Sequence, residues 1–391
     1  MQGLPHLDED DARRDRHQIG LPEVGEHGQR RLKGAAVLIV GMGGLGCPAA
    51  MYLAAAGVGQ IVLVDFDRVE ISNLQRQVLY ETSDAGRPKL QAAVARLAAL
   101  NSRVEVEGID APFDASNARG LVDRVDVVID GTDNFSTRFL VNDACVMAGR
   151  PNVFGSVLRF EGQVAVFAVA GGPCYRCLHP EPPPEGLIPN CAEGGVLGVV
   201  PGVIGSLQAL EAIKLITGAG ESLVGRMLLY DAWRMRIRQI LVPRAVDCPV
   251  CGDVPTISEL VAAAGDACAA LPVEAEISVE ELESWRGTGQ RHLLVDVREP
   301  DEYAVAHIDG AVLIPLGVLD REAHRLSREA PVVVHCRTGR RSRRAAAILR
   351  RVGLDARSLS GGFEAWSSRD CAGDVAGRSG PLEPRSGGGV I

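Results

Sequence analysis

The first half of the chain alternates short apolar runs with longer stretches rich in Ala and Leu. The short runs predict strands and the longer stretches predict helices. The predicted strands are 37–40, 61–64, 103–108 and 125–129, and the predicted helices are 48–56, 88–100 and 136–148. This order is typical of an α/β fold with parallel strands. Two later runs, at 152–157 and 162–169, alternate apolar and polar residues, so the rest of the sheet is expected to be antiparallel or mixed.

A second α/β pattern begins near residue 277. It contains predicted strands at 293–296 and 332–336 and predicted helices that start near Ser278 and Ser342. The charged residues 1–18 are expected to form a poorly ordered arm. We therefore predict a larger domain at 1–253, a linker at 254–275, a smaller α/β domain at 276–371 and a disordered tail at 372–391.

Composition narrows the class of protein. The chain has 391 residues, a formal net charge of −9 and 46% hydrophobic residues. This acidic balance argues against nucleic acid or an anionic membrane as a general partner. No run reaches about 18 uninterrupted apolar residues and residues 1–18 contain no apolar signal core, so we expect a cytoplasmic protein without a membrane span. In that compartment, metal binding or catalysis explains cysteines at motif spacing better than disulfides do.

The stretch 37–73 organises the larger domain, because it joins a strand, a glycine loop, a helix and a second strand. Gly41, Gly43 and Gly46 have the spacing G-x-G-x-x-G, and the second strand ends at Asp65. Such a unit binds a nucleotide, since glycines let the backbone approach a phosphate and the helix presents free N–H groups to the anion. The motif does not distinguish a dinucleotide from ATP. The alternative is a doubly wound sheet whose glycine loop only packs against its neighbours and binds no nucleotide.

Polar and charged side chains follow the predicted strands, at the edge where an open α/β sheet binds its ligand. Asn73 and Arg76 follow the second strand, Lys89 opens the next helix, and Asp133 follows the strand at 125–129. Cations can stabilise the charge that develops on a departing pyrophosphate, and a carboxylate can hold Mg²⁺. The set favours adenylyl transfer over hydride transfer, and a solvated charged rim is the alternative.

Two C-x₂-C pairs, Cys174 with Cys177 and Cys248 with Cys251, predict a tetrahedral zinc site with four sulfur ligands. The fold must bring these pairs together, because they lie far apart in the sequence. A redox-active pair is the alternative, although that chemistry would need only one of the two motifs. A closed site of four cysteines keeps no open position, so it is assigned no catalytic role.

A further cysteine, Cys191, follows a proline-rich loop at 180–190 that cannot form regular structure. A thiol on such a loop, close to an activated acyl group, can attack the acyl carbon or receive sulfur. A surface thiol without a chemical role is the alternative, and the sequence leaves the choice open.

Cys336 lies between a predicted strand and a predicted helix, in the segment 335–342 with the sequence HCRTGRRS. A thiolate there faces a ring of backbone N–H groups and a helix N-terminus, and the nearby arginines favour the charged form further. A C-x₅-R phosphatase loop would need Arg at the position of Ser342. The loop is a cradle for an anion or a persulfide, and its length suits a sulfur atom better than a phosphate.

Five segments together resemble one family. GMGGLG, DFD, SNLQRQ, RPK and GTDN, in this order between Arg16 and Gly252, are similar to the ubiquitin-activating-enzyme-like adenylyltransferases of the bacterial MoeB/ThiF family. The resemblance implies a Rossmann-like domain with ATP and Mg²⁺, a Cys₄ zinc site and a homodimer. It implies that Asp65 holds the ribose, that Arg76 and Lys89 bind the phosphates, and that Asp133 coordinates Mg²⁺. Further ATP-site residues would be Gly41, Gly43, Gly44, Gly46, Asp67, Asn73 and, across the dimer, Arg16 of the partner subunit.

The motifs DVRE at 296–299, AHIDGA at 306–311 and GGFEAW at 361–366, together with Glu302, resemble a rhodanese domain over about 277–370. In that family the cysteine, here Cys336, carries the persulfide. The combination is similar to the MoeZ-type fusion. It implies adenylation of the C-terminal glycine of a ubiquitin-fold sulfur carrier ending in Gly-Gly, followed by sulfur transfer to give a thiocarboxylate. Thiosulfate or a cysteine desulfurase would supply the sulfur, and the role of Cys191 differs between family members.

Two other functions stay open at this point. An NAD-dependent oxidoreductase would bind NAD and would not exchange pyrophosphate. A non-catalytic scaffold would bind a carrier protein without forming AMP and would have an unreactive Cys336. The presence of Asp133 and Cys336 counts against the scaffold.

Overall fold

The computed structural model describes residues 3–182, 195–260, 276–368 and 375–376, and the chain separates into two compact units, 1–266 and 267–391. Cys191, most of the predicted linker and most of the predicted tail lie outside the described residues. Each unit has its own sheet and its own hydrophobic core.

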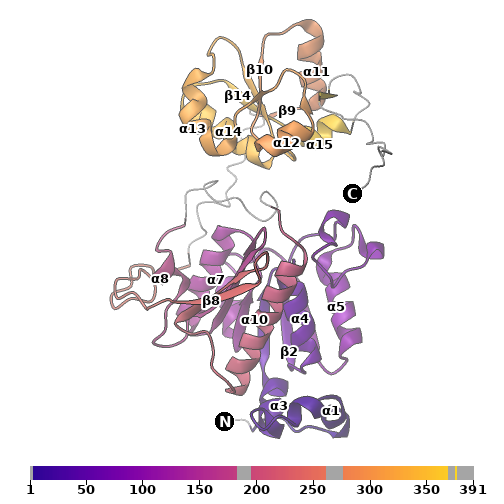
Figure 1. Cartoon of the computed structure of the whole chain (residues 1–391), viewed down its shortest axis with the longest axis vertical. Helices are drawn as coiled ribbons and strands as arrows, with labels where there is room; N and C mark the ends of the chain where they lie inside the picture. The colour runs from indigo at the N-terminus through magenta and orange to yellow at the C-terminus, as the bar shows by residue number, and fades with distance from the viewer. Residues whose placement is uncertain (1–2, 183–194, 261–275, 369–374, 377–391) are drawn as a thin grey trace, which may run out of the picture. The chain divides into compact units, whose positions relative to one another are not determined.

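The first unit is built on an eight-stranded sheet in the order β3-β2-β1-β4-β5-β6-β7-β8 (Figure 1). Its strands are β1 (Ala36–Val40), β2 (Gln60–Asp65), β3 (Glu105–Asp110), β4 (Val127–Asp130), β5 (Asn152–Leu158), β6 (Glu161–Phe167), β7 (Arg226–Asp231) and β8 (Arg236–Leu241). The strands from β3 to β5 pair in parallel, and those from β5 to β8 pair antiparallel. The predicted mixed sheet is confirmed.

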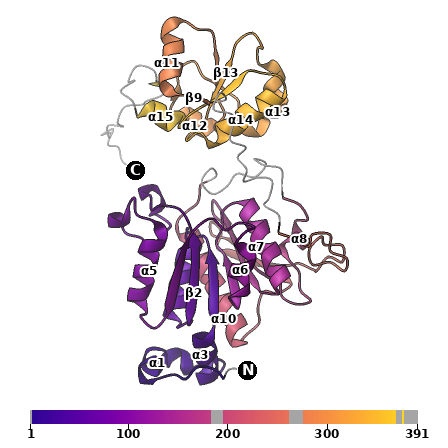
Figure 2. The same ribbon diagram turned by 180° about the vertical axis from the view of Figure 1, so that it is seen from behind.

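Helices cover both faces of the parallel half. One face packs against α4 (Gly46–Ala55), α5 (Lys89–Leu100) and α10 (Val199–Thr217), and the other against α6 (Ala118–Asp123) and α7 (Phe135–Ala148) (Figures 1 and 2). The side chains of β1 alternate between the two cores: Val37 and Ile39 join the first, and Leu38 and Val40 join the second. This explains why the strand reads as a continuous apolar run.

Helix α10 is the one helix among the described residues that is long and apolar enough to cross a membrane, by length and composition alone. Half of that stretch is buried inside the unit, where the helix packs against α4 and β5. Its buried Gln208 donates hydrogen bonds to the carbonyl oxygens of Asp130 at 2.7 Å and Val153 at 3.0 Å. Gly155 leaves room for that amide, since a Cβ there would lie 2.5 Å from Gln208. Within this unit, α10 therefore ties β4 to β5 as a core helix.

The N-terminal residues are ordered, so the prediction of a loose arm was wrong from about residue 8 onward. Three helices, α1 (Glu9–Arg14), α2 (Arg16–Ile19) and α3 (Gly25–Gly34), lie at one end of the sheet (Figure 1). Asp8 caps α1, and Arg103 pairs with Asp8, Asp10 and Asp11. Because Arg103 lies far away in the sequence, the local pattern of charges gave no sign of this anchor.

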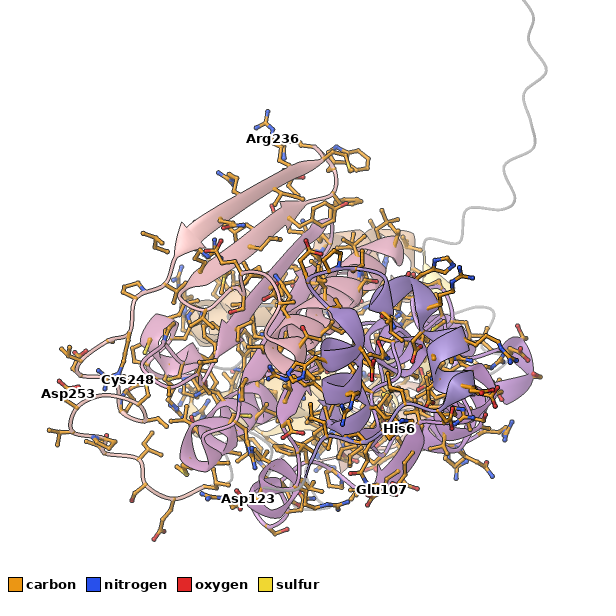
Figure 3. The ribbon with its side chains drawn as sticks, turned by 90° about the horizontal axis from the view of Figure 1, so that it is seen from below. His6, Glu107, Asp123, Arg236, Cys248 and Asp253 are labelled. Atoms are coloured by element: carbon orange, nitrogen blue, oxygen red, sulfur yellow. The ribbon has the colours of Figure 1, made fainter. Side chains whose placement is uncertain are left out.

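Short elements complete the first unit. They are the 3₁₀ turns η1 (Ile71–Asn73) and η2 (Thr82–Asp84) and the helix α8 (Tyr175–Leu178). At the far edge of the sheet, β8 is exposed along its whole length, and Arg236 projects from it (Figure 3).

The second unit has a parallel five-stranded sheet in the order β12-β10-β13-β14-β9, and its small α/β fold agrees with the prediction. The strands are β9 (Glu276–Ile277), β10 (Leu293–Asp296), β12 (Val312–Leu313), β13 (Val332–His335) and β14 (Ala356–Leu359), and a separate antiparallel pair is β11 (His307–Ile308) with β15 (Val375–Ala376). The helices are α11 (Val279–Thr288), α12 (Pro300–Val305), α13 (Leu319–Glu322), α14 (Arg340–Arg351) and α15 (Gly362–Ser367), with 3₁₀ turns η4 (Leu316–Val318) and η5 (Ala323–Arg325).

Candidate active site

The glycine loop needs its glycines because backbone atoms approach very closely there. Gly41 has a φ of 90°, and a Cβ on Gly46 would lie 2.0 Å from the carbonyl oxygen of Gly41. The loop also packs on the segment after β4, since a Cβ on Gly131 would lie 2.8 Å from that same oxygen. The loops after β1 and β4 are therefore in direct contact at the carboxyl edge of the sheet, where such folds bind ligands.

Asp65 ends β2 and fixes the glycine loop by a hydrogen bond to its backbone. One of its carboxylate oxygens accepts a hydrogen bond from Met42 N–H at 2.7 Å, and the other accepts from Asp67 N–H at 2.8 Å. The residue is only 9% exposed. Each carboxylate oxygen can accept more than one hydrogen bond, so Asp65 retains capacity for the ribose hydroxyls expected from the sequence.

The two predicted cations lie at this same edge in different electrostatic settings. The ammonium of Lys89 is 2.8 Å from Asp67 and 3.8 Å from Asp65, and the residue is only 5% exposed. Arg76 donates to the amide oxygen of Asn73 at 2.6 Å, and its side chain passes beside Gly44. Within the described part of the chain, no carboxylate pairs with Arg76. The charge of Lys89 is compensated, whereas that of Arg76 is available to a phosphate.

Asp133 lies on the loop between β4 and α7. Its side chain is exposed and has neither a hydrogen bond nor an ion pair to any residue that the structure describes. The following residue, Asn134, caps α7 by accepting from Thr137 N–H at 2.8 Å. Because β4 is the parallel neighbour of β1, this carboxylate is presented at the edge that holds the glycine loop.

One predicted residue, Arg16, does not lie with the residues of this site in its own chain. Arg16 is exposed on α2, and the neighbouring Arg14 donates to the carbonyl of Leu100 at 2.6 Å, at the C-terminus of α5. Lys89 opens that same helix at its other end, about 17 Å away at 1.5 Å per residue. Arg16 therefore belongs to the opposite end of the unit from the other residues of its own chain that were predicted to bind ATP. Cys191 lies outside the described residues.

Sequence reasoning missed two side chains that support the loop. The hydroxyl of Tyr80 donates to the Met42 carbonyl at 2.9 Å, and Gln77 is buried below the loop with 4% exposure. Burial strongly raises the pKa of Tyr80, so its phenol stays protonated and keeps donating. The sequence around Gln77, with Arg76 on one side and Val78 on the other, does not identify the contact.

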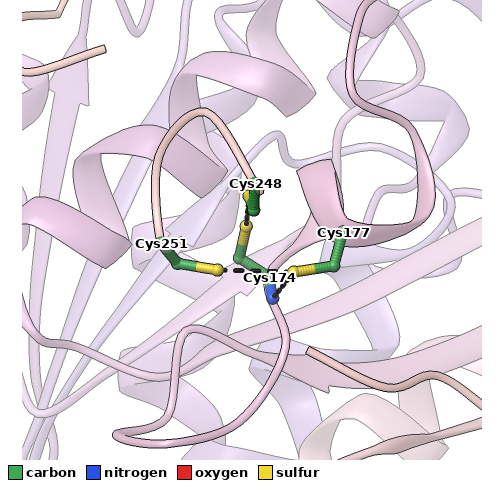
Figure 4. A group of neighbouring side chains, drawn as sticks. All are labelled: Cys174, Cys177, Cys248 and Cys251. Carbon is green, nitrogen blue, oxygen red and sulfur yellow. Dashed lines mark hydrogen bonds between the residues drawn. The ribbon is translucent and has the colours of Figure 1, made fainter. Parts of the chain in front are cut away.

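The four cysteines of the C-x₂-C motifs form one cluster in the first unit (Figure 4). Their sulfur atoms all lie within 4.8 Å of one another, with Cys174 and Cys248 at 3.5 Å and Cys177 and Cys251 at 3.3 Å. These separations exceed a disulfide bond of about 2.05 Å. They approach the spacing of about 3.8 Å in a tetrahedron of sulfurs around zinc, with bonds of about 2.3 Å. The donor set and its geometry fit a structural metal ion.

Buried hydrogen bonds hold this cluster against α7. Arg176, between two of the cysteines, forms a bidentate pair with Asp143 with contacts of 2.7 to 3.1 Å. The N–H of Tyr175 donates to the side chain of Asn142 at 2.7 Å. Burial, together with neighbouring sulfurs, raises the pKa of Cys251 to about 12. A bound cation would supply the charge that four thiolates need.

In the second unit, Cys336 follows β13 and begins the loop that leads into α14. Its sulfur accepts from Gly339 N–H at 3.2 Å, and the residue is 1% exposed. The start of α15 holds this loop through two backbone hydrogen bonds. The N–H of Phe363 donates to the carbonyl of Cys336 at 2.7 Å, and the N–H of Glu364 donates to the carbonyl of Arg337 at 3.0 Å. With two of its carbonyls bound to α15, the loop directs the N–H of Gly339 at the sulfur; the complete ring of N–H groups stays a prediction.

Two arginines of this loop, Arg337 and Arg341, are paired with glutamates. Arg341 forms a bidentate pair with Glu302 at 2.6 and 2.8 Å. Arg337 binds Glu364 at 2.7 Å. The sequence gave no indication of these pairs, because each glutamate comes from a different helix. Much of the positive charge expected at Cys336 is therefore already compensated.

Comparison with known proteins agrees with both units. Residues 15–250 match the ThiF family, and residues 278–369 match the rhodanese-like domain. The probable adenylyltransferase/sulfurtransferase MoeZ of Mycobacterium tuberculosis is 45% identical over 368 residues, which cover 92% of this chain and 94% of that protein. The adenylyltransferase and sulfurtransferase MOCS3 of Sus scrofa is 45% identical over 395 residues, covering 93% and 87%.

The first unit has further relatives. The sulfur carrier protein adenylyltransferase of Thermus thermophilus is 54% identical over 249 residues, covering 62% of this chain and 92% of that protein. Among solved structures, MccB of E. coli with succinimide aligns with a TM-score of 0.53 and 26% identity, over 58% of this chain and 68% of that one. The chain therefore belongs to the ThiF family and carries a rhodanese-like domain as its second part.

Proposed function

We propose that this protein uses ATP to adenylate the C-terminal glycine of a ubiquitin-fold sulfur carrier protein and then transfers sulfur to it from a persulfide on Cys336. One observation carries the proposal: Asp133, an exposed carboxylate without a partner among the described residues, follows the strand beside the glycine loop, in a chain that also holds a buried cysteine whose sulfur accepts from the N–H of Gly339. The relatives named as adenylyltransferases and sulfurtransferases support this combination.

In the first step, the carrier carboxylate attacks the α-phosphorus of ATP and pyrophosphate leaves. Asp65 would hold the ribose, and Arg76 and Lys89 would stabilise the charge on the departing phosphates. Asp133 would hold Mg²⁺, which supplies charge neutralisation at the phosphate oxygens. The uncompensated guanidinium of Arg76 and the free carboxylate of Asp133 support these roles.

In the second step, the Cys336 thiolate first takes the outer sulfur of a donor such as thiosulfate, which leaves as sulfite. The terminal persulfide sulfur then attacks the acyl-adenylate, AMP leaves, and the carrier is joined to Cys336 through a disulfide. A second thiol attacks the Cys336 sulfur and releases the carrier thiocarboxylate; Cys191 is the candidate. An external dithiol would reduce the resulting disulfide. A cysteine desulfurase is the alternative donor.

Several further assignments belong to this proposal. The four-cysteine cluster would hold Zn²⁺ as a structural ion. The chain would act in the cytoplasm as a homodimer, with an adenylyltransferase domain at 1–253, a linker at 254–275, a rhodanese domain at 276–371 and a tail at 372–391. A role in molybdenum cofactor biosynthesis is suggested by the relatives.

The most direct test is ATP–pyrophosphate exchange by the full-length protein with each small Gly-Gly-ending protein of the same organism. The proposal expects exchange with at least one carrier and, with thiosulfate and a dithiol, a carrier that gains 16 mass units as oxygen is replaced by sulfur. NAD binding without exchange would instead indicate an oxidoreductase, and carrier binding without AMP formation would indicate a scaffold.

Replacing Asp133 with Asn should lower the rate of ATP–pyrophosphate exchange by about 100-fold or more, because a neutral amide holds Mg²⁺ poorly. The matched control is Asp123→Asn, which removes the same charge from an exposed carboxylate on α6 that pairs with Arg119. Exchange at the wild-type rate by Asp133→Asn would exclude this role for the residue.

Replacing Cys336 with Ala should leave pyrophosphate exchange intact and abolish thiocarboxylate formation from thiosulfate, because no thiol remains to carry the sulfur. Mass spectrometry of the carrier measures the product. Added sulfide serves as a control, since it can attack the adenylate directly and should restore product. Thiocarboxylate made from thiosulfate by the Ala variant would contradict the assignment.

Mixing two inactive variants tests the partner role of Arg16. If Arg16 completes the ATP site of the partner subunit, Arg16→Ala and Asp133→Asn homodimers should each be nearly inactive. After subunit exchange, half of the dimers are mixed and one of their two sites is intact, so about a quarter of wild-type activity should return. No recovery in verified mixed dimers would argue against action across an interface.

Cys251→Ser should release the bound metal, which elemental analysis would show as a fall from one zinc per chain to none. The unfolding temperature should fall by about 10 °C, because the metal contributes folding energy. Cys268→Ser is the matched control, since this cysteine has no motif spacing, and should retain the metal. A Cys251→Ser protein with full zinc content would rule out the four-sulfur site.

A further inference from the structure

Beneath the loop that carries Asp133 lies a second, buried carboxylate, Asp130. This residue ends β4 and has no exposed surface. One of its oxygens accepts from the N–H of Thr132 at 3.0 Å and from its hydroxyl at 2.6 Å. The other oxygen has no hydrogen-bond partner among the described residues. Burial raises the pKa of Asp130, and the charge of Arg138 and the Thr132 hydrogen bonds oppose that shift.

Arg138 is a second buried side chain that binds the loop carrying Asp133. It is 7% exposed, and its guanidinium donates to the carbonyl oxygen of Thr132 at 3.1 Å. Aromatic rings surround the guanidinium, with centroids at 5.4, 5.1 and 6.0 Å: those of Phe135, Phe154 and Tyr175. Cation–π contact of this kind fixes the position of an arginine that is removed from water.

Thr132 is thus bound at every polar atom. Its N–H and hydroxyl bind Asp130, and its carbonyl binds Arg138. The preceding residue, Gly131, donates to the Val40 carbonyl at 2.9 Å and packs on Gly41. The next residue is Asp133, whose side chain has no partner in the described part of the chain. The backbone on one side of this carboxylate is therefore fixed, although the carboxylate itself is free.

We propose that Asp130 and Arg138 are positioning residues, which fix Thr132 and thereby aim the neighbouring Asp133 carboxylate at the phosphates of the bound nucleotide. Asp130 and Arg138 are both buried and both bind Thr132, without a direct contact between them. Buried charged groups are seldom favoured by stability alone, since apolar side chains of similar size often replace them without loss. A pair that orients a group for catalysis has a second reason to be retained. The inference rests on the proposed role of Asp133 and deepens it.

The test compares Asp130→Asn and Thr132→Val with wild type. Asp130→Asn keeps the size of the side chain, and Thr132→Val removes the hydroxyl bond while keeping the N–H. Both should lower kcat for pyrophosphate exchange, by about 30-fold and about 5-fold, with KM for ATP changed less than about 3-fold. Both should also raise the Mg²⁺ concentration at half-maximal rate, because a misdirected Asp133 holds the ion less well.

Glu211→Gln is the matched control. Glu211 is another buried carboxylate of the first unit, on α10, where it accepts from Leu223 N–H at 2.8 Å and pairs with Lys214. Its replacement should lower the unfolding temperature without changing the Mg²⁺ dependence. Arg138→Lys should recover part of the rate that Arg138→Met loses, because Lys keeps the charge without the planar fork.

Calorimetric titration of ATP at several Mg²⁺ concentrations, without any carrier, separates this inference from the proposed function. If wild type shows no pyrophosphate exchange but its ATP affinity depends on Mg²⁺ through both Asp133 and Asp130, the function is wrong and the positioning role stands. If Asp130→Asn and Thr132→Val keep the wild-type Mg²⁺ dependence and differ from it only in stability, as Glu211→Gln should, the positioning role is overturned. If Asp130→Asn does not fold, the Mg²⁺ dependence of Thr132→Val alone tests the positioning role.

Discussion

A close backbone contact in the first unit, between the loops after β1 and β4, is the constraint on which its candidate site depends. Gly41, Gly46 and Gly131 meet at distances that leave no space for a Cβ atom. That contact places the glycine loop and the Asp133 segment side by side, although they lie far apart in the sequence. The surrounding groups, Asp65, Tyr80 and Thr132, then fix each loop by hydrogen bonds.

The sequence allowed the βαβ unit, the mixed sheet, the paired C-x₂-C motifs and the Cys336 loop to be predicted. Each of these depends on residue types at short spacing, or on a chain order that parallel sheets share. The features that could not be predicted depend on side chains that meet across long sequence separations. Arg103 holds Asp8 from 95 residues away, and Arg341 meets Glu302 across 39. Charge patterns within one segment cannot reveal such partners, so the arm at 1–18 was read as loose.

The four-cysteine cluster and the Asp133 loop share one helix, α7. The helix begins just after Asp133, carries Arg138 in its second turn, and meets Tyr175 and Arg176 of the cluster through Asn142 and Asp143. The ring of Tyr175 also lines the pocket of Arg138. A metal ion held by the four cysteines would thus support the candidate site through packing alone, since it would stabilise the helix that follows the Asp133 loop.

Arg337 and Arg341, both close to Cys336 in the sequence, differ in how strongly dissolved ions can screen their ion pairs. Arg337 and Glu364 are 61% and 52% exposed, whereas Arg341 and Glu302 are 11% and 25% exposed. Dissolved ions screen exposed pairs over about 8 Å at physiological ionic strength, and they screen enclosed pairs far less. Salt therefore weakens the attraction between Arg337 and Glu364, whereas Arg341 stays paired with Glu302. The attraction of an anionic sulfur donor would then vary with ionic strength through Arg337, while Arg341 keeps the shape of the loop unchanged.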